Sequence, residues 1–276
     1  MLRKTRADIL KDFKAQVANG KILVGVGAGT GMTAKCSEKA DVDMLIIYNS
    51  GRFRMAGRGS LSGLLSYGDA NKIVQEMGQE VLPIVKKTPV LAGVCGTDPF
   101  RIMDIFLKQL KDQGFNGVQN FPTVGLIDGK FRANLEETGM GYGLEVDMIR
   151  EAHKLDMLTC PYVFDPEQAK AMAEAGADIL VAHMGLTTKG DIGAETAVSL
   201  DDCCTKIREI IKAGRSVNPD IMVICHGGPI AEPDDAAYVI HHVPEIDGFF
   251  GASSIERLAS ERGMTAQAAA FKAIQK

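Results

Sequence analysis

The sequence predicts an α/β fold, a (β/α)8 TIM barrel with an extra N-terminal helix, in which residues 1–276 form a single domain. Eight short apolar segments alternate with segments of helical spacing along the chain, with no linker or break in composition between them. These segments are apolar throughout, as are the strands of a parallel sheet that helices cover. The last two end in turns of small residues, where this fold commonly has a phosphate site. A doubly wound open sheet is the competing architecture.

The expected strands are runs of apolar, often β-branched residues that end in polar or small residues. They span residues 22–26, 44–48, 90–95, 117–120, 157–162, 178–183, 221–225 and 247–251. The glycine-rich turn after the first strand is not a dinucleotide fingerprint, because Thr30 and Met32 stand where that motif requires glycine. We therefore interpret it as an ordinary loop between a strand and a helix.

The expected helices have apolar residues three and four positions apart. The first, residues 5–18, precedes the first strand and would close the bottom of the barrel. Two helices are predicted to begin with an aspartate N-cap followed by proline at the first helical position, at Asp98-Pro99 and at Asp165-Pro166. Other helices are expected over residues 33–40, 69–85, 143–155, 233–242 and 263–275, and one more begins at residue 199.

Composition and charge exclude several classes of protein. Hydrophobic residues make up 46% and charged residues 24% of the chain, as is usual for soluble globular proteins. A formal net charge of −4 argues against nucleic acid as a partner, because a nucleic-acid site would be basic. No apolar run is long enough to span a membrane, and residues 1–20 lack the apolar core of a signal peptide. The six scattered cysteines predict reduced thiols in a cytoplasmic protein.

Two of the five histidines end adjacent expected strands, the sixth at His183 and the seventh at His226. The carboxyl ends of the strands form the catalytic face of a TIM barrel, and histidine exchanges protons near neutral pH. We therefore predict both as catalytic residues, with Asn120 at the end of strand four orienting the substrate. The alternative is that each histidine is structural and satisfied by hydrogen bonds.

Small residues after strands seven and eight are candidates for holding an anion through backbone N–H groups. These are Gly227, Gly228, Gly251, Ala252 and Ser253. The alternative is a pair of tight turns that bind no ligand.

Three arginines, Arg52, Arg54 and Arg58, lie in the long segment after strand two, which we expect to be a loop. Guanidinium groups match carboxylate and phosphate oxygens, so this loop would close over an anionic substrate. A solvated, mobile loop is the other interpretation.

Metal binding has two candidate sets. If the reaction needs Mg²⁺, Glu136 or Glu137 would hold it. Cys95, Cys160 and Cys225 end alternate strands and could bind zinc together with a histidine, although no close cysteine pair supports this. Cys225 is also a candidate nucleophile beside His226, and all three cysteines are equally compatible with core packing.

Several long phrases resemble the phosphoenolpyruvate hydrolase-like TIM-barrel family and, with it, the C-terminal half of plant tobamovirus-resistance proteins. The phrases are YNSGRFRMAGRGSLSG (48–63), GVCGTDPF (93–100), VQNFPTVG (118–125), EETGMGYGL (136–144), AHMGLTT (182–188), CHGGPI (225–230) and FFGASSIER (249–257). The family name implies hydrolysis at a phosphorylated or phosphono three-carbon acid. The plant proteins imply binding to a viral replication protein.

Two functional hypotheses follow. The first is a cytoplasmic TIM-barrel enzyme, a hydrolase or lyase that acts on a small phosphorylated or carboxylated metabolite such as phosphoenolpyruvate or phosphonopyruvate. The second is a non-catalytic barrel that serves as a protein-binding or ligand-sensing module. The enzyme should bring His183 and His226 into one pocket, whereas a binding module should expose an apolar patch. In either case we expect a homo-oligomer.

Overall fold

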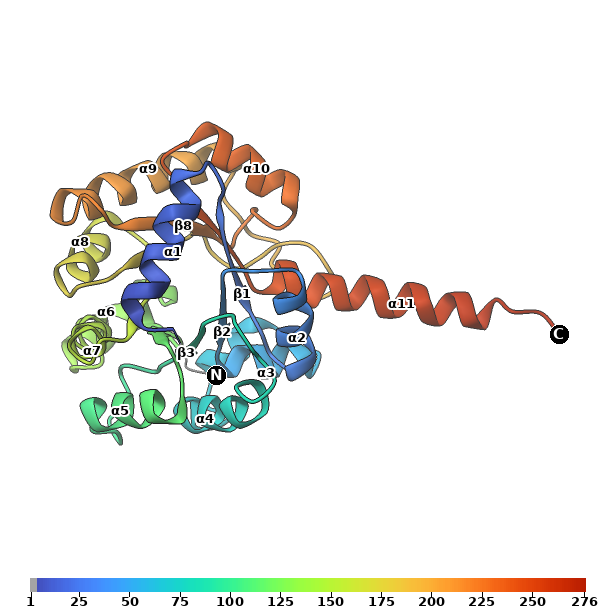
Figure 1. The fold of residues 1–276 in the computed structure, drawn as a ribbon, viewed down its shortest axis with the longest axis horizontal. Coiled ribbons are helices and arrows are strands. Elements are labelled where there is room, and N and C mark those ends of the chain that lie inside the picture. Colours follow the sequence, from blue (N-terminus) through green and yellow to red (C-terminus); the bar gives the residue numbers. More distant parts are fainter. Residues whose placement is uncertain (1–3) are drawn as a thin grey trace.

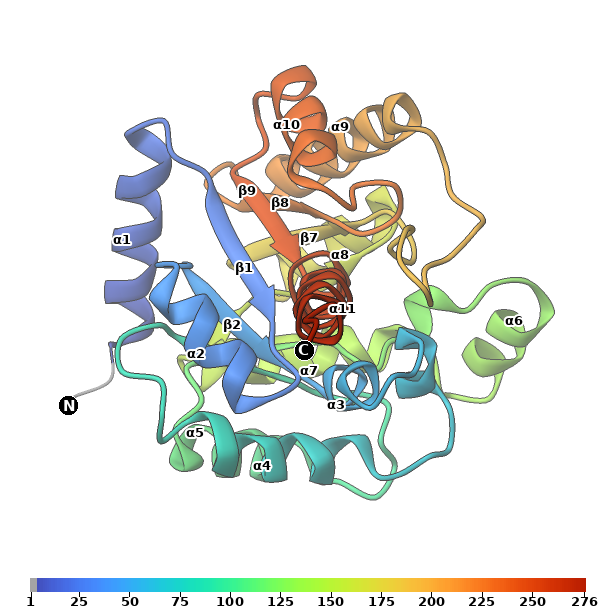
Figure 2. The ribbon, with the colours of Figure 1, turned by 90° about the vertical axis from the view of Figure 1, so that its right-hand side faces the viewer.

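The computed structural model describes residues 4–276, and one parallel sheet of nine strands forms its centre. The strands are hydrogen-bonded in the order β5-β4-β3-β2-β1-β9-β8-β7-β6. The strands β5 and β6 are two halves of the fifth expected strand, separated only by Cys160 and Pro161. The amide of Cys160 donates to Val118 on one side and the carbonyl of Pro161 accepts from Val181 on the other, so the sheet closes into a ring. The TIM-barrel prediction is therefore confirmed (Figure 2).

The strands follow the predicted ranges within a few residues. Their bounds are β1 Leu23–Gly27, β2 Met44–Ile47, β3 Val90–Gly93, β4 Gly117–Gln119, β5 Leu158–Thr159, β6 Tyr162–Val163, β7 Ile179–His183, β8 Met222–His226 and β9 Gly248–Gly251. Neighbours pair in parallel throughout, and the register places His183 of β7 directly beside His226 of β8. The apolar strand residues are almost all buried, because helices cover the outer face of the ring.

Eleven α-helices and three short turns of helix connect or flank these strands within residues 4–276. The helices are α1 Arg6–Ala18, α2 Gly31–Lys39, α3 Asn49–Met55, α4 Ala70–Val81, α5 Met103–Gln113, α6 Gly129–Glu137, α7 Gly143–Lys154, α8 Pro166–Glu174, α9 Leu200–Val217, α10 Pro233–His242 and α11 Leu258–Lys272. The short turns are η1 Ser60–Leu64, η2 Val124–Leu126 and the π-helical turn η3 Ser253–Arg257. None of these helices is both long and apolar enough to cross a membrane.

The extra helix α1 is fixed at the amino ends of the strands. Arg6 makes two hydrogen bonds to the carboxylate of Asp178, just before β7, and Gln16 bonds to that of Asp43, just before β2. Ile9 and Phe13 are buried in the core. The helix therefore lies at the bottom of the barrel, as its position in the sequence predicts (Figure 1).

Two expectations about connections were wrong. The segment after β2 is not a loop: it forms the helix α3, which starts directly at Asn49. The helix predicted from Asp98 begins only at Met103, because the Asp98 carboxylate accepts hydrogen bonds from Asn71 and the Phe100 amide and closes a turn instead. The long segment after β4 contains η2 and the helix α6.

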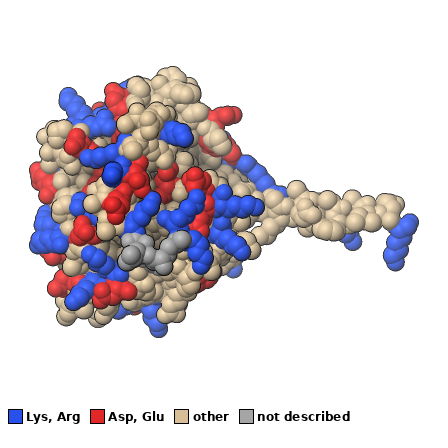
Figure 3. Space-filling view, viewed as in Figure 1, with Lys and Arg blue, Asp and Glu red and all other residues tan. Residues whose placement is uncertain are grey.

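The last helix, α11, leaves the barrel instead of covering it. It projects into solvent as a separate rod (Figures 1 and 2), and Leu258 is its one buried residue among those described. Met264 and Phe271 are 65% and 67% exposed on this rod. The face of the rod that Figure 3 shows is largely free of charged side chains. The position between α10 and α2, where the barrel wall would have its eighth helix, is consequently left without cover from α11.

Candidate functional site

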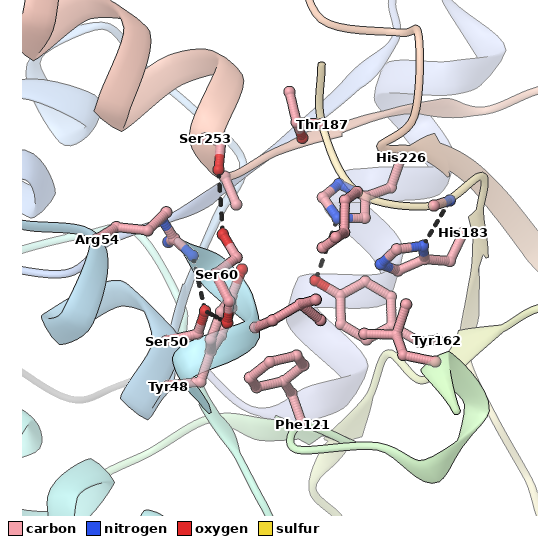
Figure 4. A pocket seen from close by; sticks show the side chains of 15 residues that line it. Tyr48, Ser50, Arg54, Ser60, Phe121, Tyr162, His183, Thr187, His226 and Ser253 are labelled. Carbon is pink, nitrogen blue, oxygen red and sulfur yellow. Dashed lines mark hydrogen bonds between the residues drawn. The ribbon is translucent and has the colours of Figure 1, made fainter. Parts of the chain in front are cut away.

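A small pocket with polar and aromatic side chains in its walls opens at the carboxyl ends of the strands. Its walls come from the exits of β2, β4, β6, β7, β8 and β9, so segments far apart in the chain meet in one place (Figure 4). The polar or ionisable lining residues are Tyr48, Ser50, Arg54, Ser60, Tyr162, His183, Thr187, His226 and Ser253. This is the end of the barrel at which TIM-barrel enzymes have their active sites.

The two predicted histidines lie together in this pocket. The ring centroids of His183 and His226 are 4.7 Å apart, with an interplanar angle of 82°. Tyr162 lies against both rings, with centroid distances of 4.8 Å to His183 and 5.2 Å to His226. The register of β7 and β8 produces this contact, because it sets the two strand-end histidines side by side.

Backbone hydrogen bonds fix opposite tautomers on the two imidazole rings. His183 Nδ1 is 3.0 Å from the Gly185 amide, which donates to it, so the ring proton is on Nε2. His226 Nδ1 is 2.7 Å from the carbonyl oxygen of Phe250, so here Nδ1 carries the proton and Nε2 offers a lone pair. His183 therefore presents a hydrogen-bond donor, and His226 presents a base.

Burial keeps both rings neutral. Desolvation lowers the pKa of His183 well below its usual value, and the neighbouring His226 lowers it further. Desolvation also lowers the pKa of His226 to about 4. A neutral pair of opposite tautomers can donate a hydrogen bond from His183 Nε2 and accept a proton at His226 Nε2.

Tyr162 contacts His226, the ring that presents a base. Its hydroxyl lies 3.5 Å from His226 Nε2, and burial raises its pKa well above the usual value, so the phenol stays protonated. Asn120 does not line the pocket. Its side chain accepts from the Tyr162 amide at 2.6 Å and donates to Glu145 at 2.6 Å, so it positions the tyrosine and does not face a substrate.

Glu145 is one of the site-supporting residues that the sequence prediction missed. It is fully buried on α7, and besides Asn120 it accepts a hydrogen bond from the Val124 amide at 2.8 Å. Burial raises its pKa to about 7. Helical spacing could have found it, because Glu145 shares one face of α7 with Ile149 and Ala152, both buried.

Of the three predicted arginines, one reaches the pocket. Arg54 has a side chain that is 1% exposed and pairs with the buried Glu256 at 3.1 Å; it also donates to Ser50. Arg52 faces outward and pairs with Glu76 on α4, while Arg58 is exposed and bonds to the neighbouring Gly57 carbonyl. The helix α3 separates Arg52 from Arg54, because residues two positions apart on a helix face different directions, and Arg58 lies beyond the end of this helix.

The predicted anion-binding residues also separate into two groups. Ala252 and Ser253 line the pocket, and the Ser253 hydroxyl lies 3.3 Å from that of Ser60. Gly227 and Gly228 do not line it: with φ of +78° and +59° they let the β8 exit pack against the β7 exit, where a Cβ would lie 2.3–2.4 Å from a backbone oxygen. Gly251 is likewise outside the lining, packed against Ile255.

The predicted metal ligands are not gathered into a site. Glu136 bonds to Arg132 within α6, and Glu137 to Asn134. Cys160 and Cys225 are buried core thiols whose pKa values burial raises, while Cys95 lies near Thr97. Across residues 4–276, no group of three or more histidine, cysteine, aspartate or glutamate side chains is arranged to hold a metal ion.

An α/β barrel with imidazole, phenol and guanidinium groups in a pocket at the carboxyl ends of its strands defines a protein of the TIM-barrel class. Within that class, the chain belongs to the phosphoenolpyruvate hydrolase-like family, which matches residues 8–274. Two tomato (Solanum lycopersicum) proteins, the ToMV susceptible protein tm-1(GCR26) and the ToMV resistance protein Tm-1(GCR237), are each 61% identical over 269 residues. The match covers 98% of this chain and 36% of each tomato protein, so the chain spans about a third of their length.

The fold is also similar to a solved structure of phosphonopyruvate hydrolase in complex with oxalate and Mg²⁺. The TM-score is 0.59 at 15% sequence identity, covering 97% of this chain and 89% of the other. At this identity the similarity concerns the fold alone.

The donor groups of the present pocket do not fit Mg²⁺. This ion prefers carboxylate and water oxygens in octahedral geometry, and no carboxylate lines the pocket. The nearby Glu256 is fully engaged: Oε1 accepts from the Gly29 amide and the Thr33 hydroxyl, and Oε2 from Arg54. His183 cannot ligate a metal through Nε2 while that nitrogen carries its proton.

Proposed function

We propose that the chain is an enzyme that acts on a small anionic metabolite in the pocket between His183, His226 and Arg54. The convergence of two neutral histidines with opposite tautomers is the observation that supports this most. A structural pair would need no such arrangement, whereas a proton-transfer site needs one donor and one acceptor directed at the same space. The small size of the pocket favours a substrate of a few carbon atoms.

In the proposed reaction, each side chain has a separate task. Arg54 binds an oxygen of the substrate, because only three of its five N–H groups are used by Glu256 and Ser50. The Nε2–H of His183 donates to the oxygen on which negative charge develops. His226 accepts a proton, directly or through the Tyr162 hydroxyl. These roles suit a hydrolase or a lyase of carboxylated or phosphorylated acids.

Turnover assays with matched histidine variants test this proposal. The purified chain is incubated with a panel of two- to four-carbon carboxylic, phosphono and phosphorylated acids, and products are followed by NMR. We expect one class of acid to be consumed, and His183→Gln and His226→Gln to lower kcat by about 100-fold or more. His242→Gln is the matched control, since that ring stacks on Tyr238 far from the pocket. Absence of turnover across the panel would contradict the enzyme proposal.

A second candidate function, a protein-binding module, has one specific observation in its favour. An open apolar groove beside the pocket is lined by Leu65, Phe100, Phe131 and Met140, and Phe100 is 93% exposed. Exposed apolar surface of this kind is typical of interaction sites. If this is the function, Phe100→Glu should abolish capture of a partner while leaving the melting temperature unchanged.

We also propose that the protein forms a homo-oligomer through α11. The uncovered wall between α10 and α2 has an apolar groove that includes Ile22, Ala236, Ile240 and Phe249. Within this chain α11 points away from that groove (Figure 1). The same helix from a second copy offers the exposed apolar side chains of Met264 and Phe271 as its complement.

A further inference from the structure

The charge balance of the pocket distinguishes between phosphorylated and carboxylated substrates. Arg54 is the one permanently cationic side chain among the lining residues. Its charge is already balanced by Glu256. The Glu256 side chain is completely buried, and its carboxylate lies 3.1 Å from the Arg54 guanidinium. Every group that contacts Glu256 donates a hydrogen bond to it, which requires the ionised carboxylate. The pair is therefore formally neutral.

No other charge in the lining alters this balance. Both histidines are neutral because they are buried. Arg52 and Arg58 point to solvent, and Arg257 is held by Glu261 and the Lys189 carbonyl. The remaining polar groups are uncharged hydroxyls, those of Tyr48, Ser50, Ser60, Tyr162, Thr187 and Ser253.

A phosphoryl group should bind weakly in such a site. It carries about 1.5 to 2 negative charges at neutral pH, and desolvating uncompensated charge is costly unless cations or a metal balance it. Here the fixed negative charge of Glu256 lies behind the guanidinium and opposes a second ligand charge. A single carboxylate, by contrast, can be satisfied by uncharged donors, namely hydroxyls, the two spare Arg54 N–H groups and the His183 Nε2–H.

We propose that the physiological ligand of this pocket is a small monocarboxylic acid without a phosphoryl group, bound by Arg54 and uncharged donors without a divalent cation. This inference rests on the proposed function and narrows it. It separates the chain from the chemistry that the family name suggests, because no carboxylate lines the pocket to hold a metal ion and the nearby Glu256 is fully hydrogen-bonded.

Binding measurements on the unmodified full chain test the inference directly. Pyruvate, inorganic phosphate and phosphoenolpyruvate are titrated by calorimetry and thermal shift at pH 7.5, each in EDTA and in excess MgCl2. We expect pyruvate to bind at least about tenfold more tightly than either phosphorylated ligand, with the same Kd in both buffers. The inference is overturned if phosphate or phosphoenolpyruvate binds more tightly, or if pyruvate binds only with Mg²⁺; the broader enzyme proposal survives both results. If none of the three binds, the inference falls, whereas the enzyme proposal is still decided by the turnover panel.

A charge variant gives a second, independent test. Glu256→Gln keeps a hydrogen-bond acceptor for Arg54 and removes the opposing charge, so phosphoenolpyruvate should bind about tenfold or more tightly than it does to the unmodified chain. Glu76→Gln, which frees the exposed Arg52, is the matched control and should change nothing. An unchanged phosphoenolpyruvate affinity in a folded Glu256→Gln protein would show that charge balance does not set the specificity.

Discussion

At the scale of single residues, burial shifts the pKa values of groups in and beside the pocket. His226 is neutral because burial lowers its pKa to about 4, and Glu145 titrates near neutrality because burial raises its pKa to about 7. The two groups change stability in opposite directions as pH changes, because burial disfavours protonation of His226 and deprotonation of Glu145.

This opposition predicts how stability depends on pH. His226 has a folded pKa below its unfolded value of 6.5, so it destabilises the fold as pH falls from 6.5 toward 4. Glu145 has a folded pKa above its unfolded value of 4.5, so it destabilises the fold as pH rises from 4.5 toward 7. Each effect amounts to about 2 kcal/mol between pH 5 and 7.

Urea unfolding at pH 5 and pH 7 measures both terms. His226→Gln removes the destabilisation that His226 causes at pH 5, so this variant should have a relatively higher free energy of unfolding at that pH. Glu145→Gln removes the destabilisation that Glu145 causes at pH 7, so this variant should have a relatively higher free energy of unfolding at pH 7. Shifts in the same direction for both variants would contradict the assignment.

The buried ion pair gives a second prediction at this scale. Arg54→Met leaves Glu256 as an unpaired buried charge and should cost about 3–5 kcal/mol of unfolding free energy. The double variant Arg54→Met/Glu256→Met should cost clearly less, because no isolated charge remains. Arg52→Met, which breaks an exposed pair, should cost less than about 1 kcal/mol in the same urea titration.

Sequence reasoning found the histidines because strand-end positions are visible in the chain. It could not find the Arg54–Glu256 pair, because the two residues are 202 positions apart and meet only when the ring closes. It also could not separate Arg54 from its neighbours, since that required knowing that the segment is helical.

At the scale of secondary structure, the position of α3 depends on a close backbone contact. A Cβ on Gly29 would lie 2.2 Å from the carbonyl oxygen of Gly51, so only glycine allows the β1 exit to touch the first turn of α3. This contact sets the distance between Arg54 on α3 and Glu256 on η3, because the Gly29 amide also binds Glu256.

Gly29→Ala should therefore displace α3 and destabilise the protein by about 2 kcal/mol or more through overpacking. Gly59→Ala is the matched control, because a Cβ there meets nothing within 4 Å and its φ of −63° suits alanine. Thermal unfolding of the two variants measures the difference. Equal melting temperatures would show that the loop can move aside at little cost.

Most elements were predictable because their apolar runs or helical periods are complete in the sequence. The exceptions are informative. The segment that forms α3 is rich in glycine and arginine, and its Asn49 and Ser50 are buried by contacts with residues 60–63 that no local pattern reveals. The start of α5 was misplaced because Asn71, on the preceding helix α4, binds the carboxylate that would have capped it.

At the scale of the whole molecule, α11 is the feature that sequence periodicity could not place. Its spacing predicts a helix, and the helix forms, but periodicity does not say against which surface it packs. The neighbouring wall remains apolar and open, so the proposed homo-oligomer would bury both surfaces at once.

Size-exclusion chromatography with light scattering tests this arrangement. The unmodified chain should elute as a dimer or larger closed assembly, and Met264→Glu/Phe271→Glu should elute as a monomer. Phe100→Glu places a negative charge on an even more exposed apolar residue away from α11 and should not change the mass. A monomeric unmodified chain would contradict the proposal.

The helical setting of Arg54 has a consequence for how a ligand is received. A guanidinium carried by a mobile lid must lose rotational freedom at each encounter, and association is weakened by that entropy. Here the ordering occurs once, when the chain folds and the backbone contact between residues 29 and 51 forms. Ligand binding should accordingly be fast. The association rate should vary with solvent viscosity only as diffusion does, and stopped-flow traces should show no slow closing phase.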